Sequence, residues 1–179
     1  QHVVALRLYT TKVFKHINEP LRRPCGKSKL AVTTYFICMA MIQMRRLYKL
    51  HRDERLPKVL WRGMRNLIVG DDFTRNKNGG AELAFMSTST SLSIATSYGV
   101  GTTDPGSTLA STLIFRIDGV SANNAPASLS WLSAFPTEEE YLFPPLTYLS
   151  PTGRRQTFHI GRFAFEVIEV KVELAHIKS

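Results

Sequence analysis

The sequence of 179 residues contains only two cysteines, Cys25 and Cys38. Two are too few for the disulfide framework of a small secreted domain, and they lack the paired spacing of a structural zinc site. Cys38 lies in an apolar run and is expected to be a small buried hydrophobic residue. A Cys25–Cys38 bridge stays open as an alternative for a secreted protein, so the cysteines do not decide between the cytosol and the outside of the cell.

No apolar run in the sequence is long enough to span a membrane. The most apolar stretch, residues 30–42, has thirteen residues, whereas a transmembrane helix needs about 20. It contains Thr33 and Thr34 and leads into arginines, so we predict a buried helix and no membrane anchor. The first residue is Gln1 and not Met, which indicates a trimmed or processed chain from which any targeting segment is missing.

The sequence also lacks a group of residues with the spacing of metal ligands. Its five histidines are scattered along the chain: His2, His16, His51, His159 and His176. We therefore expect no bound metal. The composition, with 44% hydrophobic and 21% charged residues, excludes a disordered or low-complexity chain, and there is no internal repeat. The length fits a single domain over residues 1–179.

Acidic residues are scarce in the first part of the chain. Residues 1–65 carry fifteen Lys and Arg against three acids, a net +12, and residues 66–179 carry eight against eleven, a net −3, which together give +9. A basic surface of this kind attracts phosphates or acidic partners, or is simply solvated. No nucleic-acid motif and no interleaved aromatic residues accompany the charge, so nucleic acid is an unfavoured partner.

The predicted elements are helices first and strands afterwards. Apolar spacing predicts helices over residues 3–17 and 28–52, separated by a Pro- and Gly-containing break at residues 19–26. After Pro57, strands are predicted at residues 58–63, 83–89, 108–117, 140–143 and 163–174, with a loop at 71–80 and a short helix at 92–98. This order is typical of the α+β class, with a helical lobe over residues 1–56 and a β core over residues 57–179.

Two short motifs at predicted strands carry candidate polar chemistry. In the Trp-Arg-Gly motif of residues 61–63, the arginine can reach a phosphate and the glycine lets a ligand approach the backbone. In residues 85–91, Phe-Met-Ser-Thr-Ser-Thr-Ser, strand alternation puts Ser87 and Ser89 on one face. Taken singly, each motif is more often an ordinary surface feature than a site.

A third motif is the run of three glutamates at residues 138–140, which leads into an apolar strand and is followed by residues 143–145, Phe-Pro-Pro. A charge beside an apolar strand is costly unless it has a task. Period-two geometry puts Glu138 and Glu140 on one side of the strand. Two carboxylates facing one cleft suit chemistry at a glycosidic bond, where one stabilises an oxocarbenium ion and the other manages a proton.

In this order, the three motifs resemble those of the Arg-Ser-Glu class of arginine-specific mono-ADP-ribosyltransferases, which includes clostridial actin-modifying toxins and vertebrate ecto-enzymes. That family has an arginine ending its first strand, then an aromatic-x-Ser-Thr-Ser strand, then a Glu-x-Glu pair. The resemblance spans residues 28–175, and the glutamate segment is its most specific part. It implies an α+β fold, with N-terminal helices packed on two facing, mainly antiparallel sheets and NAD in the cleft between them.

The resemblance also implies roles at the matching positions. Arg62 holds the NAD phosphate, and Gly63 offers its backbone to the nicotinamide amide. Ser87 hydrogen-bonds the catalytic Glu140, which stabilises the oxocarbenium-like transition state. Glu138 polarises the incoming guanidinium group, and a glutamate at this position argues for arginine as the acceptor.

Further positions follow from the same resemblance. Thr88 and Ser89 belong to the strand that contacts NAD, and Tyr98 lies where some members stack an aromatic ring on nicotinamide. Phe135, five residues before the catalytic glutamate, takes the place of an aromatic residue in the target-recognition loop. The chain departs from some toxins in residues 99–107, which contain no second arginine for the pyrophosphate. Hydroxyls, backbone amides or a basic residue of the N-terminal part can take over that contact.

The implied reaction is transfer of ADP-ribose from NAD to an arginine of a protein target, with release of nicotinamide, by a monomer that needs no metal. Nicotinamide leaves as a neutral molecule, so the barrier lies in the positive charge on the ribose, which a fixed carboxylate stabilises. The alternatives are an NAD glycohydrolase with the same site, and a catalytically idle NAD- or protein-binding module. The complete set of Arg62, Ser87, Glu138 and Glu140 argues against the idle module.

The basic N-terminal part leads to a first prediction. If residues 1–65 steer acidic targets, ADP-ribosylation of an acidic, arginine-containing protein should fall steeply with salt, because such attraction is screened over about 10 Å at 0.1 M. Transfer to agmatine, a small cation, should fall little. Both are measured with labelled NAD over a range of salt concentrations, and equal salt profiles for the two acceptors would contradict the steering hypothesis.

Overall fold

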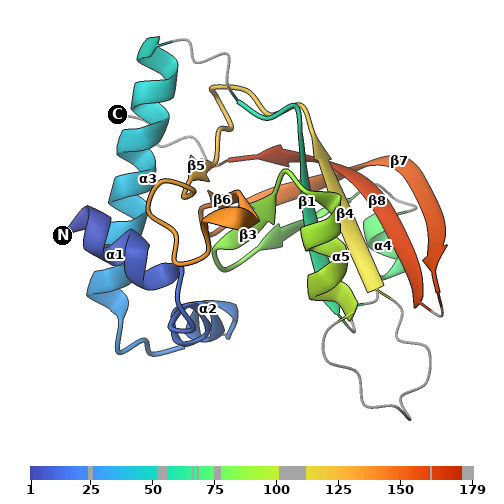
Figure 1. Ribbon diagram of the computed structural model, residues 1–179, viewed down its shortest axis with the longest axis horizontal. Helices are drawn as coiled ribbons and strands as arrows, with labels where there is room; N and C mark the ends of the chain where they lie inside the picture. Colours follow the sequence, from blue (N-terminus) through green and yellow to red (C-terminus); the bar gives the residue numbers. More distant parts are fainter. Residues whose placement is uncertain are drawn as a thin grey trace.

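In the computed structural model of the chain, three helices lie together on one side of a β-sheet (Figure 1). They are α1 (His2–Tyr9), α2 (Phe14–Arg22) and α3 (Ala31–His51). The structure describes residues 1–23, 26–51, 56–65, 67, 69–74, 78–100, 112–161 and 163–174. Cys25 lies outside these ranges, and within them Cys38 is a half-buried free cysteine of α3. None of the described helices is long and apolar enough to cross a membrane.

The first two helices divide a segment that the sequence pattern predicted as one helix over residues 3–17. The hydroxyl groups of Thr10 and Thr11 donate to carbonyl oxygens of the last turn of α1, at 2.8 and 2.7 Å, and the helix ends at Tyr9. Such side-chain hydrogen bonds offer the backbone an alternative to a continued helix. The second helix then extends into the predicted break as far as Arg22 and includes Pro20 in its last turn. Both helices line the cavity described below.

The described residues contain eight strands, in the spatial order β2-β7-β8-β4-β1-β3-β6-β5. In chain order they are β1 (Val59–Arg65), β2 (Gly80–Glu82), β3 (Met86–Ser89), β4 (Thr112–Asp118), β5 (Ala127–Ser128), β6 (Glu140–Phe143), β7 (Thr147–Ile160) and β8 (Phe163–Glu173). Neighbouring strands are antiparallel except β4 and β8, which are parallel. This arrangement confirms the α+β class, with helices ahead of a mainly antiparallel sheet.

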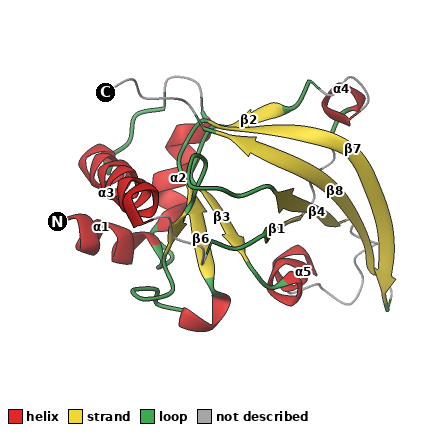
Figure 2. Cartoon of the chain, turned by 90° about the horizontal axis from the view of Figure 1, so that it is seen from above, coloured by secondary structure: helices red, strands yellow, loops and turns green. Residues whose placement is uncertain are grey.

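The strands form one hydrogen-bonded sheet, and its two parts correspond to the two facing sheets that the resemblance implies. Its parts β2-β7-β8-β4-β1 and β3-β6-β5 meet at a single residue pair, Trp61 of β1 and Ser89 of β3. A single pair allows the two parts to take different directions, as Figure 2 shows. The helices pack on the smaller part through a core that includes Ile17, Ile37 and Leu142.

The longest strand, β7, is not predicted from the sequence. It contains Pro151 and Gly153, which are unfavourable inside strands, and its second half is mostly exposed, so apolar alternation does not mark it. Pairing with β8 holds it in place, with a register shift between Pro151 and Arg155 that accommodates the irregular residues. The short β2 and β5 are missed as well, and the loop predicted at residues 71–80 contains α4 (Asp71–Thr74).

Helix α5 (Leu92–Val100) lies directly beside β1 (Figure 2) and also contacts β4, and one glycine permits each of these contacts. A Cβ atom on Gly63 of β1 would lie 1.8 Å from the carbonyl oxygen of Ala95. One on Gly99 would lie 2.0 Å from Cγ2 of Thr112. The helix backbone therefore approaches the sheet where side chains are missing, and this brings α5 to the edge of the cavity.

We expect Gly99→Ala to lower the free energy of unfolding by about 1–2 kcal/mol, because the added methyl group overpacks the contact with buried Thr112. This cost exceeds the ~1 kcal/mol that alanine gains over glycine in a helix. Gly70→Ala is the control, since a Cβ there meets nothing within 4 Å. Urea denaturation measures both variants, and equal stabilities would show that α5 has room to shift.

Candidate active site

A cavity of about 480 Å³ lies between helices α1 and α2 and strands β1, β3 and β6. All of the residues that the sequence analysis assigned to a site line this cavity: Arg62, Gly63, Ser87, Thr88, Ser89, Tyr98, Phe135, Glu138 and Glu140. They come from β1, β3, α5 and the segment around β6, so the fold gathers side chains that are distant in sequence. A cavity of this size can enclose a small-molecule ligand.

Glu140, the first residue of β6, is a carboxylate that is only 8% exposed. Antiparallel pairing places it opposite Ser89 of β3, and the hydroxyl of Ser87 donates a hydrogen bond to its Oε1 at 2.7 Å. Burial raises the pKa of Glu140, the Ser87 hydrogen bond opposes this, and the charge of Glu138 adds to it. The site therefore holds one carboxylate in a fixed place, away from bulk water.

Glu138 also reaches the cavity, but by a route that the strand pattern did not predict. It ends a 3-10 turn over Pro136–Glu138, and the following Glu139 has a left-handed backbone, with φ of 45°. That conformation is uncommon for a residue other than glycine, and it turns the chain between the two cavity glutamates. The carboxylate of Glu139 accepts a hydrogen bond from Thr90 and is not part of the cavity lining.

The hydroxyl groups of β3 hold this glutamate segment in place. Ser89 donates to the backbone oxygen of Glu138 at 2.7 Å, and Thr88 donates to that of Tyr141 at 2.8 Å. The alternating serines and threonines thus serve the strand pairing itself as well as the cavity. Because the hydroxyls of Thr88 and Ser89 bond backbone oxygens, Ser87 is the residue of this strand whose hydroxyl contacts a carboxylate of the cavity.

Tyr98 of α5, expected to stack on nicotinamide, donates a hydrogen bond from its hydroxyl to Oε1 of Glu138 at 2.8 Å. Burial and this hydrogen bond raise the pKa of Tyr98, so the phenol stays protonated as the donor. Phe135 lies on the cavity with 54% of its surface exposed. Both aromatic residues therefore flank the segment that contains Glu138.

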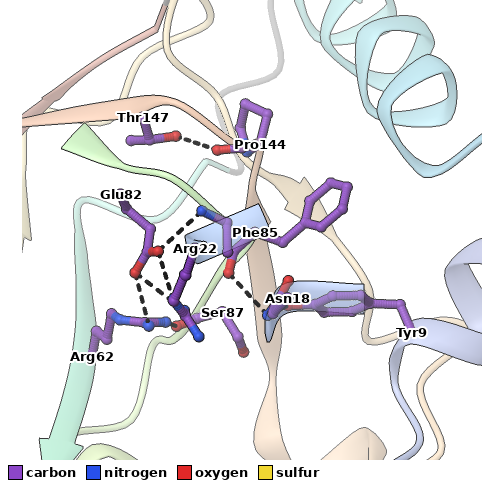
Figure 3. Close-up of polar contacts among 10 residues, drawn as sticks. Tyr9, Asn18, Arg22, Arg62, Glu82, Phe85, Ser87, Pro144 and Thr147 are labelled. Atoms are coloured by element: carbon purple, nitrogen blue, oxygen red, sulfur yellow. Dashed lines mark hydrogen bonds and ion pairs between the residues drawn. The ribbon is translucent and has the colours of Figure 1, made fainter. Parts of the chain in front are cut away.

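Arg62 of β1 is a half-buried cation of the cavity, with its side chain 16% exposed. Its Nη1 donates to the backbone oxygen of Ser87 at 2.9 Å, and its Nη2 lies 3.4 Å from Oε2 of Glu82 (Figure 3). Burial lowers the pKa of Arg62 and the charge of Glu82 raises it. The Nε group of Arg62 is buried and has no partner among the described residues. A buried N–H group without a partner is costly, so a hydrogen-bond acceptor placed beside this donor would be stabilising.

Residues of α1, α2 and the turn between them complete the cavity, although the sequence analysis did not single them out. The cations among them are Lys12, Lys15 and Arg22. They supply positive charge from the basic N-terminal part, which was one of the substitutes expected for the arginine missing from residues 99–107. Their distance in sequence from the three motifs concealed this role.

Asn18 of α2 is a second cavity residue that the sequence analysis missed. It is 5% exposed, and its Nδ2 donates to the hydroxyl of Tyr9 at 3.0 Å and to the backbone oxygen of Phe85 at 3.3 Å (Figure 3). These bonds join α1 and α2 to the start of β3. A buried asparagine in a helix signals such a role, but the sequence alone does not reveal which polar residues are buried.

Comparison with known protein families identifies the relatives of this chain. The sequence profile of the family described as NAD:arginine ADP-ribosyltransferase matches residues 1–162. This chain belongs to that family. ADP-ribosyltransferases of this family use NAD as substrate, which supports NAD-dependent ADP-ribosyl transfer by this chain. No curated protein sequence matches the chain.

Solved structures of bacterial ADP-ribosyltransferases have a similar fold. HopU1 of Pseudomonas syringae pv. Tomato DC3000 has a TM-score of 0.66 at 16% identity, over 96% of this chain and 76% of that chain. Vis of Vibrio splendidus, solved with agmatine, has 0.62 at 19% identity, over 97% and 74%. Exoenzyme S of Pseudomonas aeruginosa, solved with human 14-3-3 protein beta and carba-NAD, has 0.61 at 20% identity, over 94% and 72%. At these identities the likeness shows the fold.

The Ser87–Glu140 hydrogen bond leads to a prediction on pH. It favours the ionised carboxylate, so Ser87→Ala should raise the pKa of Glu140 further. If the reaction needs ionised Glu140, activity is lost as pH falls through this pKa, and the acidic limb should move to higher pH in the variant. Nicotinamide release, as kcat/KM for NAD against pH, is the measurement. Ser93→Ala is the control, because the hydroxyl of Ser93 contacts Ser91 and not Glu140. An unchanged acidic limb of the pH profile in Ser87→Ala would exclude the effect of Ser87 on the pKa of Glu140.

Proposed function

We propose that this chain transfers ADP-ribose from NAD to arginine side chains of a protein target and releases nicotinamide. The observation that carries the proposal is the placement of two carboxylates, Glu138 and Glu140, in one cavity with the half-buried Arg62. The cavity thus combines a cation that can hold phosphate with two anions that can act on either side of a glycosidic carbon.

Glu140 is proposed to stabilise the developing positive charge on the nicotinamide ribose. The bond between the ribose carbon and the nicotinamide nitrogen breaks, its electron pair leaves with nicotinamide, and the sugar becomes oxocarbenium-like. A carboxylate that is already positioned by Ser87 and shielded from water stabilises this charge without reorganising during the reaction. No proton has to be delivered to the leaving group, because nicotinamide departs as a neutral molecule.

Glu138 is proposed to serve the acceptor. A guanidinium group is protonated in water, so it attacks the ribose carbon only when a base polarises or removes a proton from its nitrogen. Glu138 lies beside Glu140 in the cavity, and one of its oxygens is held by the hydroxyl of Tyr98. The similar Vis enzyme was solved with agmatine, which carries the guanidinium group of arginine, and this supports the choice of acceptor.

The cations of the cavity are proposed to hold the NAD diphosphate. Arg62 keeps its buried Nε free of protein partners among the described residues, and Arg22 of α2 shares the carboxylate of Glu82 with it. Two neighbouring guanidinium groups match the paired negative charges of a diphosphate, and each has more N–H groups than its contacts with Glu82 and Ser87 use.

The protein target is proposed to dock on the exposed aromatic side chains that precede Glu138. Phe135 is 54% exposed and Trp131 is 62% exposed. Aromatic anchors of this kind supply much of the binding energy at protein interfaces. The segment that carries them is fixed from α1, where Arg7 donates to the backbone oxygen of Leu132 at 2.5 Å.

Incubation with labelled NAD tests the proposed function directly. Label should appear on agmatine and on polyarginine, which both carry guanidinium groups. Polylysine should stay unlabelled, because its side chains carry ammonium groups in place of the planar guanidinium group. Nicotinamide release without labelled acceptor would identify an NAD glycohydrolase. No release and no transfer would identify a binding module.

The three adjacent glutamates allow the roles to be separated by matched substitutions. Glu140→Gln should reduce both transfer and NAD hydrolysis by about 10²–10³, because it removes a preorganised charge beside the oxocarbenium ion. Glu138→Gln should remove transfer to agmatine and leave most of the NAD hydrolysis, because water needs less help than a guanidinium group. Glu139→Gln is the control, since this side chain bonds Thr90 and does not line the cavity.

Rates of nicotinamide release and of agmatine modification, measured on the same preparations, give both activities. Equal loss of transfer and hydrolysis in Glu138→Gln would show that the two glutamates do not divide the work in this way. Hydrolysis near the native rate in Glu140→Gln would exclude that residue as the stabilising carboxylate.

A further inference from the structure

Glu82, the last residue of β2, lies between the two arginines of the cavity (Figure 3). Its Oε1 is 3.0 Å from Nε of Arg22, and its Oε2 is 3.3 Å from Nη2 of the same side chain. The same Oε2 lies 3.4 Å from Nη2 of Arg62. One carboxylate therefore binds a helix cation with two contacts and a strand cation with one.

The carboxylate of Glu82 is itself held in place. The backbone N–H of Ala84 donates to its Oε1 at 3.1 Å, and its side chain is only 16% exposed. Arg22 and Arg62 line the cavity, whereas Glu82 does not. Glu82 therefore contacts both guanidinium groups on the side that faces away from the cavity, and it leaves the ligand space free.

Arg62 is oriented from two sides by these contacts. Nη2 faces Glu82, Nη1 donates to the backbone oxygen of Ser87, and Nε is left without a partner among the described residues. Ser87 in turn bonds Glu140 through its hydroxyl. A continuous series of direct contacts therefore runs from α2 to the catalytic end of β6.

Two neighbouring guanidinium groups also repel each other, so their spacing requires a counter-charge. Burial lowers the pKa of Arg62, Glu82 acts in the opposite direction, and Arg22 lowers it further. Arg22 is 45% exposed and has solvent available to it. Without Glu82, this long side chain would lose the contacts that hold it beside Arg62.

We propose that Glu82 is a positioning residue of the NAD site, which sets the distance and orientation of Arg22 and Arg62 for the diphosphate. The proposal rests on the proposed use of this cavity for NAD. It adds a residue of β2 to the site and makes the junction between the helices and the sheet part of substrate binding. Glu82 acts through the two arginines and does not itself contact NAD.

NAD affinity measured by calorimetry tests this role, with Glu140→Gln as the background that prevents turnover. Adding Glu82→Gln should raise the Kd for NAD about tenfold, the effect of losing one charge-assisted hydrogen bond. Glu82→Asp keeps the charge at a shorter reach and should restore part of the affinity. The matched control is Glu19→Gln of α2, which removes the same charge from an exposed ion pair with Arg23, the residue after this helix, and should leave the Kd unchanged.

Steady-state kinetics of Glu82→Gln in the native background separates positioning from a merely structural role. Positioning should raise KM for NAD and change kcat little, whereas a loosened fold would lower kcat and thermal stability together. An unchanged Kd would overturn the proposal. A lower Kd would overturn it as well, because the carboxylate would then compete with the diphosphate for the arginines.

The proposed function and the role of Glu82 can fail separately. If the Glu140→Gln protein binds no NAD, the proposed use of the cavity fails. If it binds NAD and neither Glu82→Gln nor Glu82→Asp weakens binding, only the positioning role fails. Should Glu82→Gln not fold, Glu82→Asp carries the test, with weaker NAD binding expected and native affinity as the contradicting result.

Discussion

A carboxylate withdrawn from water needs a hydrogen-bond donor, and in this protein Ser87 supplies one to Glu140. The donor and the acceptor stand on neighbouring strands, so the bond exists only because β3 and β6 pair in antiparallel register. The same pairing lets Ser89 hold the backbone at Glu138. The relative placement of both glutamates, and with it the chemistry proposed for the cavity, therefore depends on this strand pair and its hydroxyl groups.

Opposite charges are separated within the cavity. The anions stand on β6 and the turn before it, while Arg62 and Arg22 stand on β1 and α2. In the proposed reaction the cations attract the phosphates of NAD, and the anions stabilise the ribose as it becomes positive. Glu82 belongs to neither group, because it neutralises part of the charge behind the arginines without facing the ligand space. Likeness to Vis, HopU1 and exoenzyme S at 16–20% identity supports the fold that holds this arrangement.

Much of the fold was predictable, and the errors have identifiable causes. The α+β class and strands such as β1, β3, β6 and β8 follow from short strand-forming runs bounded by turn residues, which are a local property of the chain. β7 was missed because it carries a proline and a glycine and exposes half of its length, and only pairing with β8 stabilises it. The division between α1 and α2 was missed because two threonine hydroxyls end the first helix. Glu139 turns the chain with a left-handed backbone that strand periodicity does not predict.

The sequence by itself determined the three motifs, their order and the family, because each motif is a run of adjacent residues. Arg62, Ser87 and Glu140 could be named from the sequence, since each belongs to a short motif of adjacent residues. Only the tertiary structure decided that Arg22, Asn18 and Glu82 join them. The Arg22–Glu82 ion pair links positions 60 residues apart, and the Asn18–Phe85 bond links positions 67 apart. Contacts at such separations depend on how helices pack on a sheet, and no local pattern in the chain encodes which two distant polar residues will meet.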